Sequence, residues 1–378
     1  MKTIKNIIIN LCILLVMLAI LFGIGEVVAR IRFSFSESGP TAVSLQIFEG
    51  SDIYGWGHAP GSLDHHGYGE PTPEVSINSL GFRDDEITIK KPENTKRILV
   101  LGDSFTFGMG VAHKDIFMKI LESELNNSKD TNYQVINMGS IGYTTDNEYL
   151  LLKEKGLQLD PDLVIVAFFA GNDVTEFRRH EWETDQDGKL IALTDTEHYV
   201  DQEKRLRYKG QEEPKSYALH FLDKRWQIFK KKFGLEKEEK KATLTWPAFL
   251  DPDDPNGDPR ITEFWQQIST VLESMKNELD QRNIKLLVTA IPMDVQTSKK
   301  YWNKYAEMYF DDEAYEKNRP QTKLRELTEK LGIDLIDLLP YFREAGDDNW
   351  FYYQEQDPHW TVEGNKFAAK ILFENLSL

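Results

Sequence analysis

The sequence predicts an α/β fold in which helices cover both faces of a parallel sheet. Short, continuous apolar runs are typical of strands that are buried on both faces, and five such runs follow one another along the chain. Longer stretches with helical spacing of apolar residues separate these runs. Regular alternation of strands and helices favours a parallel, doubly wound sheet.

The first expected strand begins at Arg97, in the run Arg-Ile-Leu-Val-Leu-Gly-Asp-Ser. The other strands are expected at 133–138, 163–170, 284–291 and 334–338. Helices are expected at 116–125, 146–155, 261–281 and 321–330, and a last helix should start near Thr361. No internal repeat is visible.

The N-terminus carries an apolar run from Ile7 to Ile24, preceded by Lys2 and Lys5. Its length is close to what a helix needs to cross a bilayer. Residues 1–33 are therefore a membrane anchor or a signal segment. We expect an uncleaved anchor that places the long C-terminal part outside the cytoplasm.

Three further parts follow this segment. Residues 34–95 are rich in glycine and proline and read as an N-terminal extension. Residues 96–378 form the main domain, which contains a charge-rich insertion at about 177–260.

Composition excludes some classes of function. The 378 residues carry a formal net charge of −17, so the phosphate backbone of a nucleic acid is not an expected partner. The one cysteine, Cys12, excludes an intrachain disulfide and a cysteine-based metal site. No metal or organic cofactor is implied by the chain.

A basic amphipathic stretch lies inside the insertion. Its apolar residues recur at helical spacing among lysines and arginines, and they are Leu222, Trp226, Phe229 and Phe233. Such a helix can lie on an anionic membrane surface, or it can pack against its own protein. The sequence leaves both alternatives open.

The candidate catalytic residues follow the expected strands or precede the last helix. Ser104 follows the first strand, and a serine hydroxyl becomes a nucleophile when a base removes its proton. His359 can be that base, and Asp357, two residues before it, can orient its ring. Gly142 and Asn172 follow the second and third strands and could donate hydrogen bonds to an oxyanion. Together they predict an enzyme that forms an acyl-Ser104 intermediate.

These motifs resemble the SGNH hydrolases, also called GDSL-like lipases and esterases, over residues 97–376. The resemblance rests on Gly-Asp-Ser at 102–104, Gly142, Gly-Asn-Asp at 171–173 and the Asp357/His359 pair. It implies a flavodoxin-like three-layer α/β/α sandwich. It also implies an oxyanion hole made by the backbone N–H groups of Ser104 and Gly142 and the side chain of Asn172. The stretch Asn78-Ser-Leu-Gly-Phe-Arg-Asp and the single anchor are similar to membrane-anchored bacterial members.

One departure bears on the reaction. The common family pattern has an aspartate three residues before the histidine, where this chain has Gln356. Asp357-x-His359-Trp360 instead resembles SGNH-type acetyltransferases of exported polysaccharides. We expect an esterase acting on O-acyl esters, such as those carried by a glycan. The alternatives are an O-acetyltransferase of a cell-envelope or exported polysaccharide, and a non-catalytic envelope assembly protein.

Overall fold

The structure is a computed structural model, and it forms two compact units. One unit comprises Met1–Ala42 and Tyr208–Ala242, and the other comprises Val43–Arg207 and Thr243–Leu378. The residues that the structure describes are 2–35, 45–68, 71–171, 173–174, 180–196, 198–209, 216–232, 260–298, 302–303, 317–346, 349–353 and 358–377.

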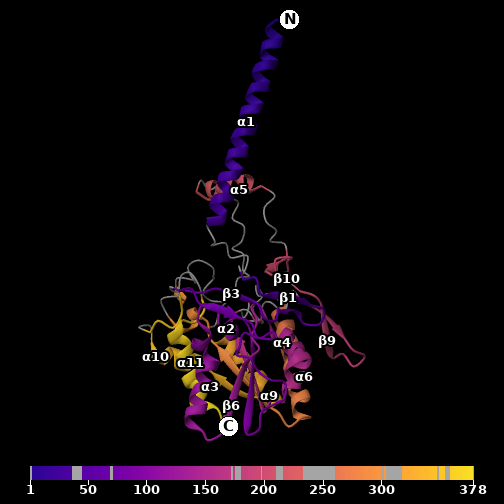
Figure 1. The fold of residues 1–378 in the computed structure, drawn as a ribbon, viewed down its shortest axis with the longest axis vertical. Helices are drawn as coiled ribbons and strands as arrows, with labels where there is room; N and C mark the ends of the chain where they lie inside the picture. Colours follow the sequence, from indigo (N-terminus) through magenta and orange to yellow (C-terminus); the bar gives the residue numbers. More distant parts are fainter. Residues whose placement is uncertain are drawn as a thin grey trace. The chain divides into compact units, whose positions relative to one another are not determined.

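A five-stranded parallel sheet forms the centre of the second unit (Figure 1). Its spatial order is β13 (Asp334–Asp337), β12 (Lys285–Ile291), β7 (Leu163–Phe169), β5 (Thr95–Gly102) and β6 (Asn132–Asn137). All four neighbouring pairs are parallel. Numbered in chain order this is 2-1-3-4-5, the flavodoxin-like order. All seven residues of β7 are buried, which explains its unbroken apolar sequence.

Helices cover both faces of this sheet. On one face α3 (Phe117–Ser128) contacts α11 (Val362–Asn375), and on the other α6 (Arg260–Asp280) contacts both α4 (Thr145–Leu151) and α9 (Arg319–Leu331). Shorter helices α7 (Asp294–Thr297) and α10 (Leu339–Ala345) follow β12 and β13. The predicted three-layer α/β/α fold is confirmed, and each expected strand and helix is present within a few residues of its expected bounds.

The segment before the sheet contributes to the same core. It forms two antiparallel pairs, β1 (Phe48–Ser51) with β2 (Gly55–His58) and β3 (Leu63–His65) with β4 (Glu74–Ser76). Leu45, Ile47 and Trp56 are completely buried and belong to the hydrophobic core that includes the sheet. The described residues from Leu45 to Ser76 therefore fold together with the sheet.

The insertion adds two more antiparallel pairs to this unit. They are β8 (Glu181–Thr184) with β9 (Leu190–Asp195), and β10 (His198–Val200) with β11 (Leu206–Tyr208).

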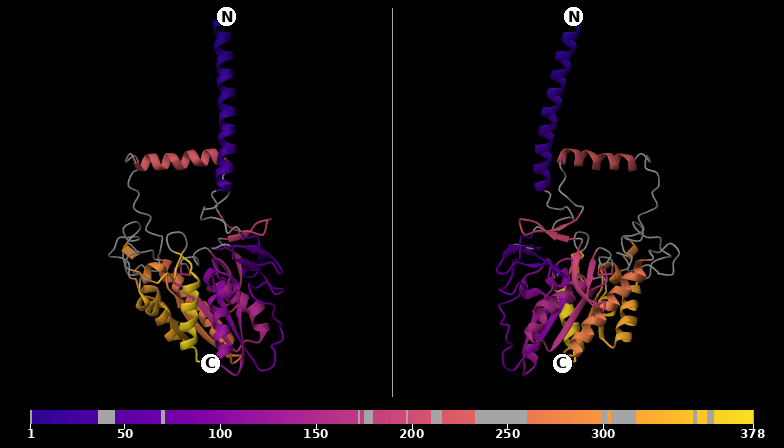
Figure 2. Two further views of the ribbon diagram at one scale, coloured as in Figure 1. Left: turned by 60° about the vertical axis from the view of Figure 1, so that its left-hand side comes forward. Right: turned by 90° about the vertical axis from the view of Figure 1, so that its right-hand side faces the viewer.

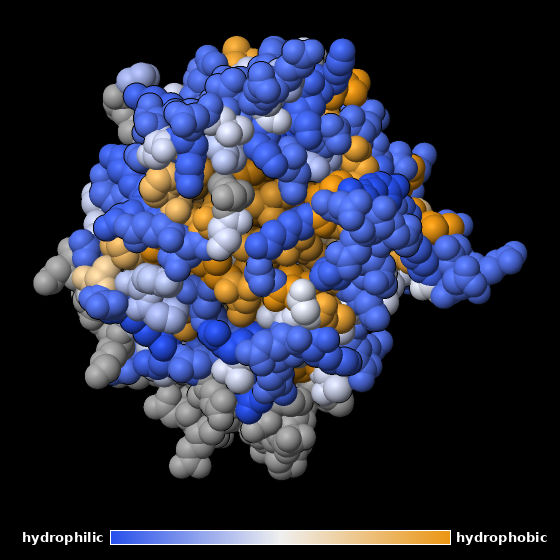
Figure 3. All heavy atoms as spheres, turned by 90° about the horizontal axis from the view of Figure 1, so that it is seen from below, coloured by the Kyte–Doolittle hydropathy of each residue, from blue (hydrophilic) through white to orange (hydrophobic). Residues whose placement is uncertain are grey.

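In the space-filling view of Figure 3, hydrophilic side chains cover most of the face seen from below, and hydrophobic side chains are visible between them in the middle.

The first unit contains two helices, α1 (Lys2–Phe35) and α5 (Tyr217–Lys232). The stretch Ile9–Arg30 of α1 is long and apolar enough to cross a membrane, and a signal sequence would also fit this description. Figure 2 shows α5 lying crosswise to α1 near the C-terminal end of α1.

Candidate active site

Ser104 lies at the junction between β5 and a short helix, α2 (Ser104–Phe107). Asp103 caps this helix, because its Oδ1 accepts a hydrogen bond from the Phe105 N–H at 2.9 Å. Gly102 is required by the close packing of the turn. A Cβ at residue 102 would lie 2.1 Å from Thr106 Oγ1, which no side chain could tolerate. The strand–turn–helix geometry thus presents Ser104 at the carboxyl end of the sheet.

His359 comes from the other end of the chain and contacts the serine directly. Its Nε2 lies 2.7 Å from Ser104 Oγ, within hydrogen-bond distance. The loop that carries it is closed by a β-bridge between Tyr352 and Trp360. It leads into α11, where the Thr361 side chain accepts the Gly364 N–H as an N-cap. A base in contact with a hydroxyl is the geometry that activates a serine nucleophile.

Aromatic rings fix the orientation of the His359 imidazole. The Phe105 ring packs on it with 4.9 Å between ring centroids, and meets Trp360 edge to face at 5.1 Å. Trp360 is buried and stacks on Phe342 with 5.5 Å between centroids. These contacts limit rotation of the imidazole because each ring is packed against another.

Two buried carboxyl groups, those of Asp103 and Glu148, lie close enough to interact electrostatically. Burial raises the pKa of Asp103 to about 6, while the Phe105 N–H and the charge of His359 act in the opposite direction. Burial also raises the pKa of Glu148 well above its usual value, and the charges of Asp103 and Asp146 add to this effect. Among the described residues, neither Glu148 oxygen has a hydrogen-bond partner. The buried site therefore favours the neutral form of Glu148 over the charged form.

Gly142 lies in the loop that follows β6, and its φ is +77°. This left-handed backbone conformation favours glycine. A Cβ at 142 would also approach the ring of His198 to 3.1 Å and that of Trp56 to 3.5 Å. Segments from the extension and from the insertion thus pack against the predicted oxyanion-hole glycine.

Asp357 and Asn172 lie outside the described residues, so their roles remain predictions. On either side of residue 172, Gly171 and Asp173 follow β7. Asp173 Oδ2 accepts the Phe169 N–H at 2.7 Å, which holds the end of that strand.

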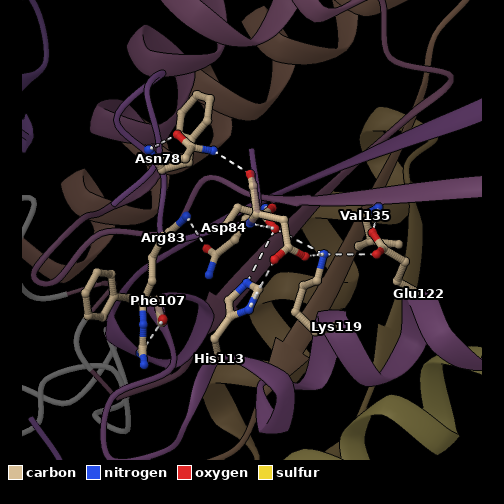
Figure 4. A network of polar contacts seen from close by, with 12 residues as sticks. Asn78, Arg83, Asp84, Phe107, His113, Lys119, Glu122 and Val135 are labelled. Carbon is tan, nitrogen blue, oxygen red and sulfur yellow. Dashed lines mark hydrogen bonds and ion pairs between the residues drawn. The ribbon is translucent and has the colours of Figure 1, made fainter. Parts of the chain in front are cut away.

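Sequence reasoning missed the function of the stretch 78–86 (Figure 4). Arg83 is buried, and its guanidinium donates to Phe107 O at 3.1 Å, Gly108 O at 2.6 Å and Val111 O at 2.8 Å. Phe107 and Gly108 end the helix that begins with Ser104, so Arg83 satisfies carbonyl groups that the helix end leaves open. The Asn78-Ser-Leu-Gly-Phe-Arg-Asp motif was the available signal, but its spacing does not reveal what Arg83 contacts.

Asp84 continues this network and links the extension to the sheet. Its Oδ2 accepts the Asn137 N–H at 2.8 Å, at the end of β6. Asp84, Asp85 and His113 could supply ligand atoms to a metal ion. The Lys119 ammonium, however, lies 3.1 Å from Asp84 and 3.4 Å from Asp85, so a protein cation already balances these carboxylates.

The aromatic run after Asn349 divides between the core and the surface. Phe351 and Tyr352 are buried, and the Tyr352 hydroxyl donates to Pro292 O at 2.9 Å. Trp350 is 62% exposed, whereas the Tyr353 hydroxyl donates to Gly110 O at 3.1 Å. Trp350 is thus the ring of this run that is free to meet a ligand.

One family model matches the C-terminal part of the chain. Residues 253–378, about a third of the chain, match a family described as an SGNH hydrolase-like domain of the acetyltransferase AlgX. This part contains β12, β13, α11 and His359. The match confirms the predicted resemblance to SGNH hydrolases over these residues.

Solved structures with similar topology include several esterases. The acetyl xylan esterase AlAXEase has 15% identity and a TM-score of 0.39, with 74% of this chain and 99% of that chain covered. A lipase/acylhydrolase from Enterococcus faecalis has 13% identity and a TM-score of 0.39, with 74% and 94% covered. The acetylxylan esterase Axe2 from Geobacillus stearothermophilus has 11% identity and a TM-score of 0.40, with 75% and 94% covered. No curated protein matches the sequence significantly. The fold assignment therefore rests on the strand order and site of this chain.

Proposed function

We propose that this protein is a serine-dependent esterase that acts on O-acyl esters through an acyl-Ser104 intermediate. The observation that carries the proposal is the 2.7 Å contact between His359 Nε2 and Ser104 Oγ. It joins residues from opposite ends of the chain at the carboxyl edge of the sheet, where ligands bind in doubly wound folds.

In the first half-reaction, His359 Nε2 takes the proton of Ser104 Oγ as the oxygen attacks the acyl carbonyl carbon. The oxyanion that forms would be stabilised by the N–H groups of Ser104 and Gly142 and by the Asn172 amide. Collapse of this intermediate breaks the ester bond, and His359 returns the proton to the leaving alcohol. Asp357 would orient the imidazole and stabilise its charged form.

In the second half-reaction, an acceptor attacks the acyl-Ser104 carbonyl while His359 takes the acceptor's proton. Water as acceptor releases the free acid, whereas a sugar hydroxyl yields an acylated glycan. The second candidate function is therefore O-acetyl transfer to a cell-envelope or exported polysaccharide. Two observations favour it: the Asp357-x-His359-Trp360 spacing and the acetyltransferase family matched by residues 253–378.

We further propose that α1 is an uncleaved anchor and that the catalytic unit lies outside the cytoplasm. The stretch Ile9–Arg30 and the lysines before it support this placement. An extracytoplasmic site would have access to glycans and their esters in the cell envelope.

A test of the proposal uses the full chain in detergent with p-nitrophenyl acetate and a fluorescent fluorophosphonate. We expect the protein to be labelled at Ser104 and to hydrolyse the ester, and we expect Ser104→Ala to lower kcat by about 10³-fold or more. Ser274→Ala is a matched control, since Ser274 lies on α6 and its hydroxyl donates to Thr270 O within that helix.

Adding a xylo-oligosaccharide separates the two candidates. Acetylated oligosaccharide detected by mass spectrometry, with less free acetate, supports acyl transfer, and free acetate alone supports hydrolysis. If the wild type is neither labelled nor active, the protein is not a serine esterase, and the non-catalytic alternative stands.

A further inference from the structure

The apolar face of α5 is exposed, although a helix of this composition usually buries such a face. The exposed fractions are 57% for Leu219, 57% for Leu222, 54% for Trp226 and 42% for Phe229. With about 100° of rotation per residue, these four side chains fall on one side of the helix. The rings of Trp226 and Phe229 stack with 5.4 Å between their centroids, so they extend along this side together.

Cationic residues accompany this apolar face. The sequence of α5 contains Lys224, Arg225, Lys230, Lys231 and Lys232, against one acidic residue, Asp223. The chain as a whole is strongly acidic, with a net charge of −17, so this local excess of positive charge is opposite to the rest of the protein. An apolar face bordered by cations suits a surface that is apolar inside and anionic outside.

The N-terminus of α5 is held by the end of α1. The Glu26 carboxylate accepts hydrogen bonds from Tyr217 N at 3.1 Å, from Ala218 N at 2.9 Å and from Ser216 Oγ at 2.7 Å. These are the donors that the first turn of α5 leaves open, and a carboxylate there is also favoured by the helix dipole. Arg30 completes the joint: its Nε lies 2.9 Å from Glu26 Oε1, and its guanidinium lies over the Tyr217 ring.

Glu26 and Arg30 belong to the last turns of the stretch Ile9–Arg30 that can span a membrane. The joint therefore fixes the start of α5 at the end of that stretch, which is the level of the headgroups if α1 spans the bilayer. A crosswise helix starting at this level runs along the membrane surface rather than through it (Figure 2).

We propose that α5 is an interfacial helix that lies on an anionic lipid surface beside the anchor, with Leu219, Leu222, Trp226 and Phe229 inserted among the lipids. This inference rests on the proposed anchor α1 and is independent of the proposed esterase activity. The sequence left open whether this helix lies on a membrane surface or packs against its own protein. The exposed apolar face favours the membrane surface.

The test places a fluorophore on each side of α5 in the full chain. Cys12→Ala removes the native thiol, and Leu222→Cys or Lys224→Cys is labelled with an environment-sensitive nitrobenzoxadiazole dye. Each protein is reconstituted into vesicles of phosphatidylcholine, with or without phosphatidylglycerol. Position 224 is the matched control because it lies about 160° around the helix from Leu222, on the side opposite the four apolar residues.

At residue 222 we expect blue-shifted emission in vesicles with phosphatidylglycerol, strong quenching by spin-labelled lipid, and iodide quenching about fivefold weaker than at residue 224. Glu26→Gln should weaken the joint and make the 222 signal more accessible to iodide. An aqueous spectrum at residue 222, or equal iodide quenching at 222 and 224, would overturn the proposal when the protein has reconstituted. Failure to reconstitute at all would instead count against α1 as the anchor, and with it against the basis of this inference.

Discussion

At the scale of single residues, a buried arginine supports the turn that presents Ser104. Arg83 contacts the end of α2, the short helix that begins with Ser104. Its guanidinium donates hydrogen bonds to the carbonyl groups of Phe107 and Gly108. Burial lowers the pKa of Arg83 to about 10, so the side chain remains charged at neutral pH and its hydrogen bonds are charge-assisted. We regard Arg83 as a positioning residue for the nucleophile.

Arg83→Lys should lower kcat for p-nitrophenyl acetate by about tenfold and leave KM nearly unchanged, because a lysine ammonium cannot reach all the carbonyl groups that the guanidinium fork holds. Arg83→Ala should also lower the unfolding free energy by about 3 kcal/mol, since buried carbonyl groups would lose their donor. Steady-state kinetics and the rate of fluorophosphonate labelling measure the first effect, and denaturant unfolding measures the second.

Arg325→Lys is the control, because Arg325 is half exposed and pairs with Asp337 outside the site. If Arg83→Lys lost stability while the remaining folded enzyme kept the wild-type kcat and labelling rate, Arg83 would have a structural role only.

At the scale of elements, the helix α4 contains two buried carboxyl groups, those of Asp146 and Glu148. Glu148 is completely buried in this helix, near Asp103 and Asp146, and nothing among the described residues hydrogen-bonds to its carboxyl group. Asp146 is stabilised as a charge, because it accepts from His180 Nδ1 at 2.9 Å and from Trp182 Nε1 at 2.8 Å. In this helix the pKa of Glu148 is therefore raised and that of Asp146 is lowered, although a single residue separates them in the sequence.

This arrangement makes stability depend on pH. The pKa of Glu148 is well above 4.5 in the folded state, so the folded protein binds more protons than the unfolded chain as pH rises from about 4.5. Stability contributed through this group is highest below that pH and falls as pH rises toward the folded pKa. In Glu148→Gln the slope of the unfolding free energy between pH 5 and pH 8 should be less negative by up to about 1.4 kcal/mol per pH unit.

Thermal unfolding of both proteins across this pH range is the measurement. Glu374→Gln on α11 is the matched control, because Glu374 is exposed and its substitution should leave the slope unchanged. Parallel pH profiles for wild type and Glu148→Gln would mean that Glu148 ionises in the folded protein as it does in water.

At the scale of the whole molecule, the chain divides into a unit that contains the apolar helix α1 and a unit that contains Ser104 and His359. The insertion contributes to both, since β8 to β10 pack in the catalytic unit whereas α5 belongs with α1. The large apolar side chains of α1 are exposed, among them Leu15 at 57% and Leu21 at 62%, and lipid is the environment that would cover them.

We expect the full chain, expressed in a bacterial host, to stay in the membrane pellet after extraction with alkaline carbonate. The double variant Leu15→Lys/Leu18→Lys should be released, because each lysine at the centre of a span costs about 3 kcal/mol. Immunoblotting of pellet and supernatant measures this.

A second experiment tests on which side of the membrane the C-terminal part lies. In a variant with Cys12→Ala and Ser377→Cys, a membrane-impermeant maleimide added to intact spheroplasts should label residue 377. Release of a shortened wild-type chain would identify residues 1–33 as a cleaved signal segment.

The local pattern of the sequence by itself determined the five strands, the covering helices, the apolar N-terminal helix and the placement of Ser104 and His359 at element ends. These features depend on neighbouring residues, such as the unbroken apolar run of β7 and the capping residue Thr361 before α11. The roles of Asp357 and Asn172 remain predictions of that pattern.

Only the tertiary structure decided that His359 contacts Ser104, that Arg83 holds the end of the nucleophile helix, and that α5 joins α1 through Glu26. Each of these contacts links segments far apart along the chain. The motifs around Ser104 and His359 predicted the roles of these two residues, but the energy of the contacts comes from desolvated hydrogen bonds and packed rings that exist only once the chain has folded.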